Sequence, residues 1–312
     1  MYGPEYDLII SEICKRNGID LQEVGNCKLL KRAGITVPIW SRRFSLNSAP
    51  TARIIDSKWV CSALLELNHV PSVQHKQLSN PSSQSYQKQA KSNQTICEDL
   101  LQQHGGVVIK PNDAYEGKGV CACFSSKEVE SALLKGFQQY STLVVSPFID
   151  ICSEYRVFYL AGTCLLAYKK ILPTIQGDGV STVAQLISAL GLEKDDILKT
   201  VNLDQVLPLG TPSVIGWKYN LSRGSSPQII SDEKLEKKLY DLAQQAAETV
   251  NGEFMTVDII EEKESHLFRI IEINSGVAMD QFIIKHKNGR QIAYNIYEKA
   301  VNLAFQKQTR II

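Results

Sequence analysis

The segment TVDIIEEKESHLFRIIEINSG, near the end of the chain, places the strongest constraint on the fold. Two stretches rich in β-branched residues, Met255 to Glu261 and His266 to Ile273, flank a charged turn and predict an antiparallel hairpin. Asp258, Glu272 and Asn274 would then lie close together. Their hard oxygen ligands suit Mg²⁺, which favours one or two carboxylates beside nucleotide phosphates. Asn and Gly also end strands readily, so this motif alone leaves a simple turn open.

A second candidate site lies upstream, in VVIKPNDAYEGKGV. Lys110 ends a buried strand-like run, and a loop with Gly117 and Gly119 leads into the strand-like segment Val120 to Phe124. Glycine lets backbone amides approach phosphates closely, and the lysine adds a positive charge. The spacing is neither a Walker loop nor a dinucleotide fingerprint. A glycine-containing hairpin with a surface lysine is the alternative interpretation.

The order of the motifs resembles the ATP-grasp superfamily. It runs from IIDSKWVCSALLELNHVPSV through VIKPNDAYEGKG, LVVSPFID and EYRVFYLAG to the acidic hairpin. Within the superfamily the chain is most similar to the group of cyanophycin synthetase, bifunctional glutathione synthetases and RimK-type glutamate ligases. The stretches EYRVFYLAGTCLLAYKK, GDGVSTVAQLI and NLSRGS carry this closer resemblance. It covers roughly residues 50 to 305 in the expected order.

The resemblance implies an α/β fold of the α+β type, in which two lobes with antiparallel sheets clamp ATP behind a short N-terminal α/β lobe. We expect an abbreviated N-terminal lobe over 1–54, a subdomain with the phosphate loop over 55–145 and a subdomain with the metal site over 146–312. Hydrophobic patterning predicts helices at Tyr6 to Asn17, Asp56 to Leu67 and Asn288 to Gln306, short strands at Lys28 to Lys31 and Ile35 to Trp40, and a polar loop or flap at Ser79 to Asn93.

The nucleotide contacts follow from the resemblance one position at a time. It implies Lys58 and Lys110 over the phosphates, Gly117 and Gly119 in the phosphate loop, Ser146, Pro147, Phe148 and Ile149 along the adenine edge, and Glu154 at the ribose hydroxyls. Ser146 stands where the family usually has glutamate, so we expect the adenine contacts to come from the backbone. Lys58 considered alone is typical of the polar face of any helix.

The reacting end is implied in the same way. Asp258, Glu272 and Asn274 match the positions that hold two Mg²⁺ ions, for which Mn²⁺ can substitute. Arg156 and Lys169 match basic positions facing the phosphates or the incoming carboxylate, and Asn220 and Arg223 match a loop that reaches the γ-phosphate and the substrate. Other ligases carry an arginine two residues before the first metal aspartate, where this chain has Thr256. We therefore expect Arg223 or Arg156 to stabilise the oxyanion of the tetrahedral intermediate.

The implied reaction is ATP-dependent carboxylate-amine ligation, in which a substrate carboxylate becomes an acylphosphate and an amine then displaces phosphate to give an amide. No GxSxG elbow or Ser-His-Asp arrangement contradicts this. An ATP-grasp kinase acting on a hydroxyl and a catalytically silent ATP-binding regulator are the two alternatives. We expect an amino acid or peptide substrate, with a carrier protein or carrier peptide and a homodimer left open.

Composition gives further expectations. The net charge of +1 with interspersed signs gives no basic stripe, so we expect no nucleic-acid partner. No apolar run reaches the length of a membrane span and MYGPEYD lacks the features of a signal peptide, so we expect no membrane association and a cytoplasmic protein. The eight cysteines lack CxxC spacing and are expected to be reduced. No histidine falls at ligand spacing to another histidine or cysteine, and the sequence predicts no zinc site.

Overall fold

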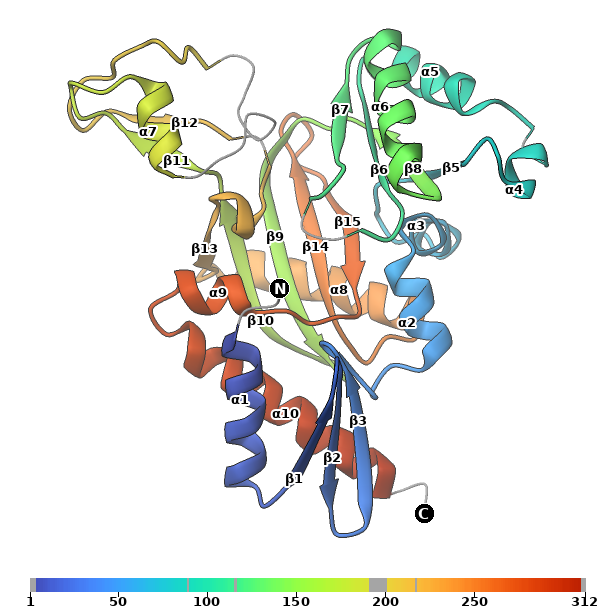
Figure 1. Cartoon of the computed structure of the whole chain (residues 1–312), viewed down its shortest axis with the longest axis vertical. Helices are drawn as coiled ribbons and strands as arrows, with labels where there is room; N and C mark the ends of the chain where they lie inside the picture. The colour runs from blue at the N-terminus through green and yellow to red at the C-terminus, as the bar shows by residue number, and fades with distance from the viewer. Residues whose placement is uncertain (1–3, 89, 115–116, 191–200, 217, 310–312) are drawn as a thin grey trace.

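The computed structural model describes residues 4–88, 90–114, 117–190, 201–216 and 218–309. Its chain builds a large lobe, a small lobe above it, an N-terminal sheet below and a projecting insertion (Figure 1). Among the described helices, none has the length and apolarity needed to cross a membrane.

The large lobe is built on an antiparallel sheet of order β13-β10-β9-β14-β15. Its strands are β9 Ile151–Leu160, β10 Thr163–Ile171, β13 Ser226–Ile229, β14 Phe254–Glu262 and β15 Phe268–Asn274. Apolar side chains at alternate positions pack one face against α8, Glu233–Val250. The opposite face carries apolar residues at one end of the strands and charged residues at the other. This division places the candidate site, because strand side chains alternate between the two faces.

The small lobe is a second antiparallel sheet of order β5-β8-β6-β7. Its strands are β5 Lys76–Ser79, β6 Val107–Pro111, β7 Cys121–Cys123 and β8 Thr142–Pro147. The helices α5 Asn93–His104 and α6 Ser126–Gln139 supply the rest of its apolar core. The polar stretch expected as a loop between Ser79 and Asn93 contains the short helix α4, Gln84–Gln87.

The helix expected from Asp56 to Leu67 is present from Lys58 onward, and a second helix that was not expected precedes it. They are α2 Ala49–Asp56 and α3 Lys58–Leu67. Ser57 is extended, with φ −95° and ψ 105°, and its hydroxyl accepts a hydrogen bond from the Val60 amide as the N-cap of α3. A serine that caps a helix start interrupts the helical pattern. As a consequence, Lys58 lies in the first turn of α3.

The N-terminal region is an antiparallel sheet of order β1-β2-β3-β4, flanked by α1, Pro4–Arg16. Its strands are β1 Asp20–Val24, β2 Cys27–Arg32, β3 Ile35–Trp40 and β4 Arg43–Phe44. The expected amphipathic helix and both strands expected here are present, and α10, Gly289–Thr309, corresponds to the expected C-terminal helix.

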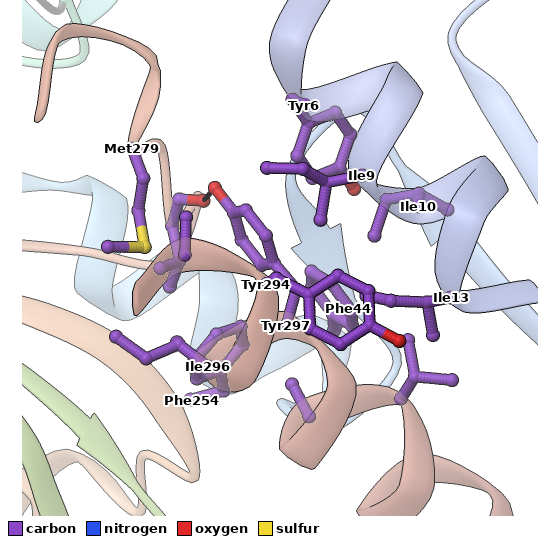
Figure 2. Close-up of a cluster of buried hydrophobic side chains, with 14 of the residues drawn as sticks. Tyr6, Ile9, Ile10, Ile13, Phe44, Phe254, Met279, Tyr294, Ile296 and Tyr297 are labelled. Carbon is purple, nitrogen blue, oxygen red and sulfur yellow. Dashed lines mark hydrogen bonds between the residues drawn. The ribbon is translucent and has the colours of Figure 1, made fainter. Parts of the chain in front are cut away.

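This N-terminal sheet shares its core with the large lobe. Tyr6 of α1 meets Tyr297 of α10 edge to face with ring centroids 5.1 Å apart, and Phe44 of β4 meets Phe254 of β14 at the same separation (Figure 2). All four rings are buried. Aromatic residues of this size dominate the burial of apolar area in a core. Residues 4–46 therefore complete the large lobe instead of forming a core of their own.

A small insertion leaves the large lobe between β10 and β13. It contains β11 Thr174–Gln176, α7 Val183–Ala189 and β12 Pro212–Val214 around a small apolar cluster of its own. Asp178, in the GDGVST stretch, accepts hydrogen bonds from the amides of Val180 and Ser181 and forms the turn before α7. The chain returns through a short 3₁₀ turn, Leu221–Arg223, which belongs to NLSRGS.

Candidate functional site

The acidic hairpin forms as expected. β14 and β15 pair antiparallel, with Asp258 opposite Glu272 and Thr256 opposite Asn274. Directly opposed residues of an antiparallel pair point to the same face of the sheet. A register shift follows Asp258, so that Ile259 pairs with Ile270. The strand pairing therefore brings together the oxygen ligands that the sequence places fourteen residues apart.

Cations from the neighbouring strands surround Asp258. Arg156 of β9 donates two hydrogen bonds to its carboxylate, at 2.8 and 2.6 Å, and Lys170 of β10 lies 3.0 Å from Oδ1. Lys170 also donates to Glu154 of β9. Burial alone would raise the pKa of Asp258, yet Arg156 and Lys170 hold it well below its usual range. Burial raises the pKa of Glu154 despite the ammonium of Lys170 beside it.

The basic residue that β10 contributes to this face is Lys170, and the expectation for Lys169 is wrong. Lys169 is aligned with Tyr155, whose ring belongs to the core against α8. Lys170 is aligned with Glu154 and contacts both acidic residues. Side chains alternate along a strand, so one residue of displacement moves a lysine to the opposite face. A bulge near Cys164 makes that parity hard to count from sequence.

The two expected lysines approach from outside the large lobe. Lys58 is 8% exposed, lies 3.1 Å from Glu272 and donates to the carbonyl of Ala114 at 2.9 Å. Lys110, on β6, is 7% exposed. Burial lowers the pKa of Lys110 to about 8, and the nearby carboxylate of Glu272 only partly offsets this. Both ammonium groups thus approach the acidic hairpin from α3 and from the small lobe.

The glycine loop adopts a conformation that favours glycine. Gly117 and Gly119 have φ of +67° and +69°. A Cβ on Gly119 would lie 2.9 Å from Pro111, and one on Gly117 would lie 3.3 Å from Nδ2 of Asn220. Residues 115 and 116 lie outside the described part of the chain. The loop therefore reaches across from the small lobe to the NLSRGS segment.

The NLSRGS segment is held rigidly under this loop. Oδ1 of Asn220 accepts from the amide and hydroxyl of Ser222. Lys285, from α9, Asp280–Lys285, donates to the carbonyls of Leu221 and Ser225. Arg223 ends the 3₁₀ turn that these contacts fix. The expected pair, Asn220 and Arg223, thus lies on a braced segment, with Asn220 beside the glycine loop.

The interlobe connection matches the position expected for the adenine edge. Ser146 and Pro147 end β8, and Ser146 is buried. The Phe148 amide donates to the carbonyl of Gly106 at 2.9 Å, and the Phe148 ring packs on Phe124. Ile149 follows, two residues before β9 begins. Glu154, expected at the ribose, lies on the charged face of the sheet, but Lys170 binds its carboxylate in this structure.

One cluster of residues beside the candidate site was not predicted from the sequence. Asp56, at the end of α2, accepts from Nε of Arg43 at 2.9 Å and from the hydroxyl of Ser275 at 2.8 Å. The Arg43 guanidinium also donates to that hydroxyl. Ser275 directly follows Asn274, and Asp56 precedes Lys58 by two residues. Asp56 therefore links the N-terminal sheet to the end of the acidic hairpin, directly before the start of α3, which carries Lys58. No sequence spacing signals this link, because Ser275 lies more than 200 residues from both Arg43 and Asp56.

The donor set fits a hard divalent cation. Asp258, Glu272 and Asn274 supply only oxygen ligands, and Asp258 is ionised because the neighbouring cations depress its pKa. In this structure Arg156, Lys170 and Lys58 neutralise the two carboxylates. A metal ion bound together with nucleotide phosphates would compete with these contacts, because each carboxylate can either pair with an arginine or lysine or coordinate the metal.

Comparisons with known proteins agree with this arrangement. No protein-family model matches the chain. Cyanophycin synthetase from Trichormus variabilis is 24% identical over 207 residues, which cover 57% of this chain and 23% of that protein. A bifunctional glutathione biosynthesis protein from Streptococcus agalactiae is 30% identical over 84 residues, 26% of this chain and 11% of that protein. The chain therefore spans less than a quarter of the length of these curated relatives.

Solved structures extend the agreement to almost the whole chain. The bifunctional glutathione synthetase from Pasteurella multocida superimposes with a TM-score of 0.56 at 15% identity, covering 96% of this chain and 44% of that one. D-alanine–D-alanine ligase from Bacillus anthracis gives 0.55 at 13% identity, covering 84% of this chain and 70% of that one. Motif order, sheet topology and these superpositions lead to one conclusion: the chain has the fold of these carboxylate-amine ligases, as its resemblance to the ATP-grasp superfamily predicts.

Proposed function

We propose that this protein is an ATP-dependent ligase that joins a carboxylate to an amine through an acylphosphate. The observation that carries the proposal is the convergence of Lys58 and Lys110 on the carboxylates of Asp258 and Glu272. Point-charge ammonium groups neutralise phosphate oxygens, while the carboxylates and Asn274 bind Mg²⁺. Bound Mg²⁺, as one or two ions, would neutralise charge on the transferring phosphoryl group.

The chain's own residues position the reactants. Lys110 and the amides near Gly117 and Gly119 bind the phosphates, and the backbone of Ser146 to Ile149 contacts the adenine. The glycine loop, resting against Asn220, excludes water that would otherwise hydrolyse the acylphosphate. A substrate carboxylate attacks the γ-phosphate and releases ADP. An amine then attacks the acyl carbon and expels phosphate, giving an amide.

Arg223 is the stronger candidate for the oxyanion role. Arg156 donates two hydrogen bonds to Asp258 on the large-lobe sheet, and Arg223 ends a braced turn whose Asn220 lies beside the glycine loop. A forked guanidinium suits the oxyanion of a tetrahedral intermediate. We expect Arg223→Ala to lower kcat by about 10²-fold, the typical cost of losing an oxyanion donor, with ATP affinity changed little. Single-turnover amide formation and nucleotide titration measure the two effects; full activity would contradict the role.

The two named relatives are a cyanophycin synthetase and a glutathione biosynthesis protein, and glutathione is a peptide, so we propose amino acids or short peptides as substrates. A suitable test incubates the protein with Mg-ATP and pooled amino acids and dipeptides, with and without hydroxylamine. Hydroxamate together with ADP would support acylphosphate chemistry and identify the carboxylate donor. ADP with neither phosphate nor hydroxamate would favour transfer to a hydroxyl and contradict the proposal. Glu272→Gln serves as the matched inactive protein.

A further inference from the structure

A second group of potential metal ligands lies at the turn end of the acidic hairpin, where β14 ends beside the start of β9. Sγ of Cys152, a carboxylate oxygen of Glu261 and a ring nitrogen of His266 all lie within 4.8 Å of one another. They come from the start of β9, the end of β14 and the turn before β15. Thiolate, imidazole and carboxylate together are the ligand types of zinc, whereas Mg²⁺ takes oxygen ligands.

We propose that Cys152, Glu261 and His266 form a binding site for a zinc-class divalent cation, with its fourth position open to water. The pairing of β9 with β14 explains why Cys152 is available. Glu261 is aligned with Ser153 and Glu262 with Ile151, so Cys152 is the extra residue of a β-bulge. A bulge leaves its extra residue out of the ladder and re-aims its side chain. Cys152 is exposed, unlike a cysteine that fills a core.

Glu261 is oriented as a ligand would be. The hydroxyl of Tyr155 donates to Oε2 at 2.8 Å, and Nδ1 of His266 lies 3.0 Å from Oε1. Outer hydrogen bonds of this kind fix a ligating carboxylate and commonly accompany metal sites. Tyr155 is buried and stacks on Phe268, so its hydroxyl is held in place. Glu261 therefore has one oxygen restrained and the other directed toward His266.

The distances require only small side-chain rotations. Tetrahedral zinc with bonds of about 2.0 to 2.3 Å places its ligand atoms about 3.5 Å apart. The Glu261 and His266 atoms already lie within that separation, and the exposed side chain of Cys152 can rotate between staggered states. Neighbouring charges do not compete for Glu261, because Lys263 pairs with Asp150 and Arg269 pairs with Glu262.

The site would also join two segments next to the interlobe connection. Cys152 follows that connection by three residues, and the Lys263 amide in the hairpin turn already donates to the Asp150 carbonyl. A bound cation would add a stronger link between the same two segments. The histidine and cysteine are 114 residues apart in the sequence (266 − 152), so spacing alone did not indicate them.

Cobalt titration of the metal-free full chain, kept reduced with a phosphine, tests the proposal. We expect one equivalent of Co²⁺ to produce a thiolate-to-metal charge-transfer band that Zn²⁺ abolishes. Cys152→Ser should remove the band, whereas Cys121→Ser, at an exposed cysteine in the small lobe, should keep it. His266→Ala should weaken binding, and Tyr155→Phe should weaken it about tenfold as an outer hydrogen bond is lost. Circular dichroism checks that each variant is folded.

Two results would overturn the site. One is a wild-type protein that shows no thiolate band; the other is a band that persists in Cys152→Ser. Loss of the band in Cys152→Ser with undiminished affinity in His266→Ala would likewise contradict the three-residue assignment. The readout needs neither ATP nor turnover, so its failure would leave the proposed ligase function untouched.

Discussion

The two sides of the candidate site balance their charges differently. On the large-lobe side, Asp258 is paired with both Arg156 and Lys170, and Lys170 is shared with Glu154. On the small-lobe side, Lys110 is buried, and among the described residues we find neither an ion pair nor a hydrogen bond for its ammonium group. On the large-lobe side the acidic and basic side chains therefore neutralise one another, whereas on the small-lobe side burial destabilises the charged form of Lys110.

This difference indicates which side depends on a ligand. A buried charge pair is costly to break but needs nothing further, because each ion satisfies the other. A buried and unpaired ammonium is destabilised, and a polyanion such as a nucleotide triphosphate would relieve it. We therefore expect the large lobe to preserve its geometry without a ligand, and the ammonium group of Lys110 to gain a partner when phosphate binds. The comparison predicts large structural losses on one side and ligand-linked losses on the other.

The largest expected effect is on the acidic hairpin. Glu272→Gln removes a carboxylate charge from the metal ligands and the partner of Lys58. We expect turnover to fall by about 10³-fold or more, because metal stabilisation of the transferring charge supplies several kcal/mol. Steady-state ADP release measures this, and thermal unfolding checks the fold. Glu264→Gln, in the exposed turn of the same hairpin, is the matched control. Unchanged turnover in Glu272→Gln would disprove the metal assignment.

The adjacent lysines of β10 provide a test within one strand. Lys170→Met leaves Glu154 without its cation and Asp258 with Arg156 alone, and breaking a buried pair typically costs about 3–5 kcal/mol. Lys169→Met replaces a half-buried lysine on the opposite face, for which no ion pair is found among the described residues, and should cost about 1 kcal/mol or less. Urea unfolding of the two variants measures the difference. Equal destabilisation would show that the charged face has been assigned to the wrong lysine.

The link through Asp56 should have a smaller effect, on the metal site in particular. Asp56→Asn keeps a hydrogen-bonding group for Ser275 but loses the charge that binds Arg43. Because Ser275 adjoins Asn274, we expect about tenfold more Mg²⁺ to be needed for half-maximal ADP release, the usual cost of a lost supporting contact. Asp99→Asn breaks an exposed pair with Lys91 in the small lobe and serves as the control. An unaltered Mg²⁺ requirement would show that Asp56 stabilises the fold without supporting the metal site.

Sequence order predicted the fold and which residues lie together in most of the candidate site, because these residues fall in short local patterns. Asp258, Glu272 and Asn274 lie on one hairpin, so alternation and turn chemistry were enough to bring them together. The glycine loop and its lysine are also local. The helix expected over Asp56 to Leu67 is present as α3 and starts two residues later, at Lys58, because the hydroxyl of Ser57 caps it.

Other features depend on long-range packing and left no local signal. Lys170 and Lys169 are equally basic neighbours, and only the strand register separates them. The Asp56 link and the common core of the N-terminal sheet join residues more than 200 positions apart. The roles assigned to individual residues at ATP, ribose and substrate stay predictions. Strand register and cross-lobe contacts are properties of the folded chain, and a single sequence does not encode them in any spacing.

The smallest expected effect is a pH dependence of ATP affinity that comes from Lys110 on the small-lobe side. The pKa of Lys110 is lowered to about 8, and bound phosphates would raise it again. The contribution of Lys110 to ATP affinity should therefore be nearly constant below about pH 7 and fall as pH rises through its pKa, by roughly fivefold between about pH 8 and pH 9 for one linked proton. Isothermal titration in buffers of different ionisation enthalpy should show proton uptake in the same range. Lys110→Arg, which stays charged, should lose this dependence; a wild-type affinity that is flat to pH 9.5 would mean that Lys110 does not contact the phosphates.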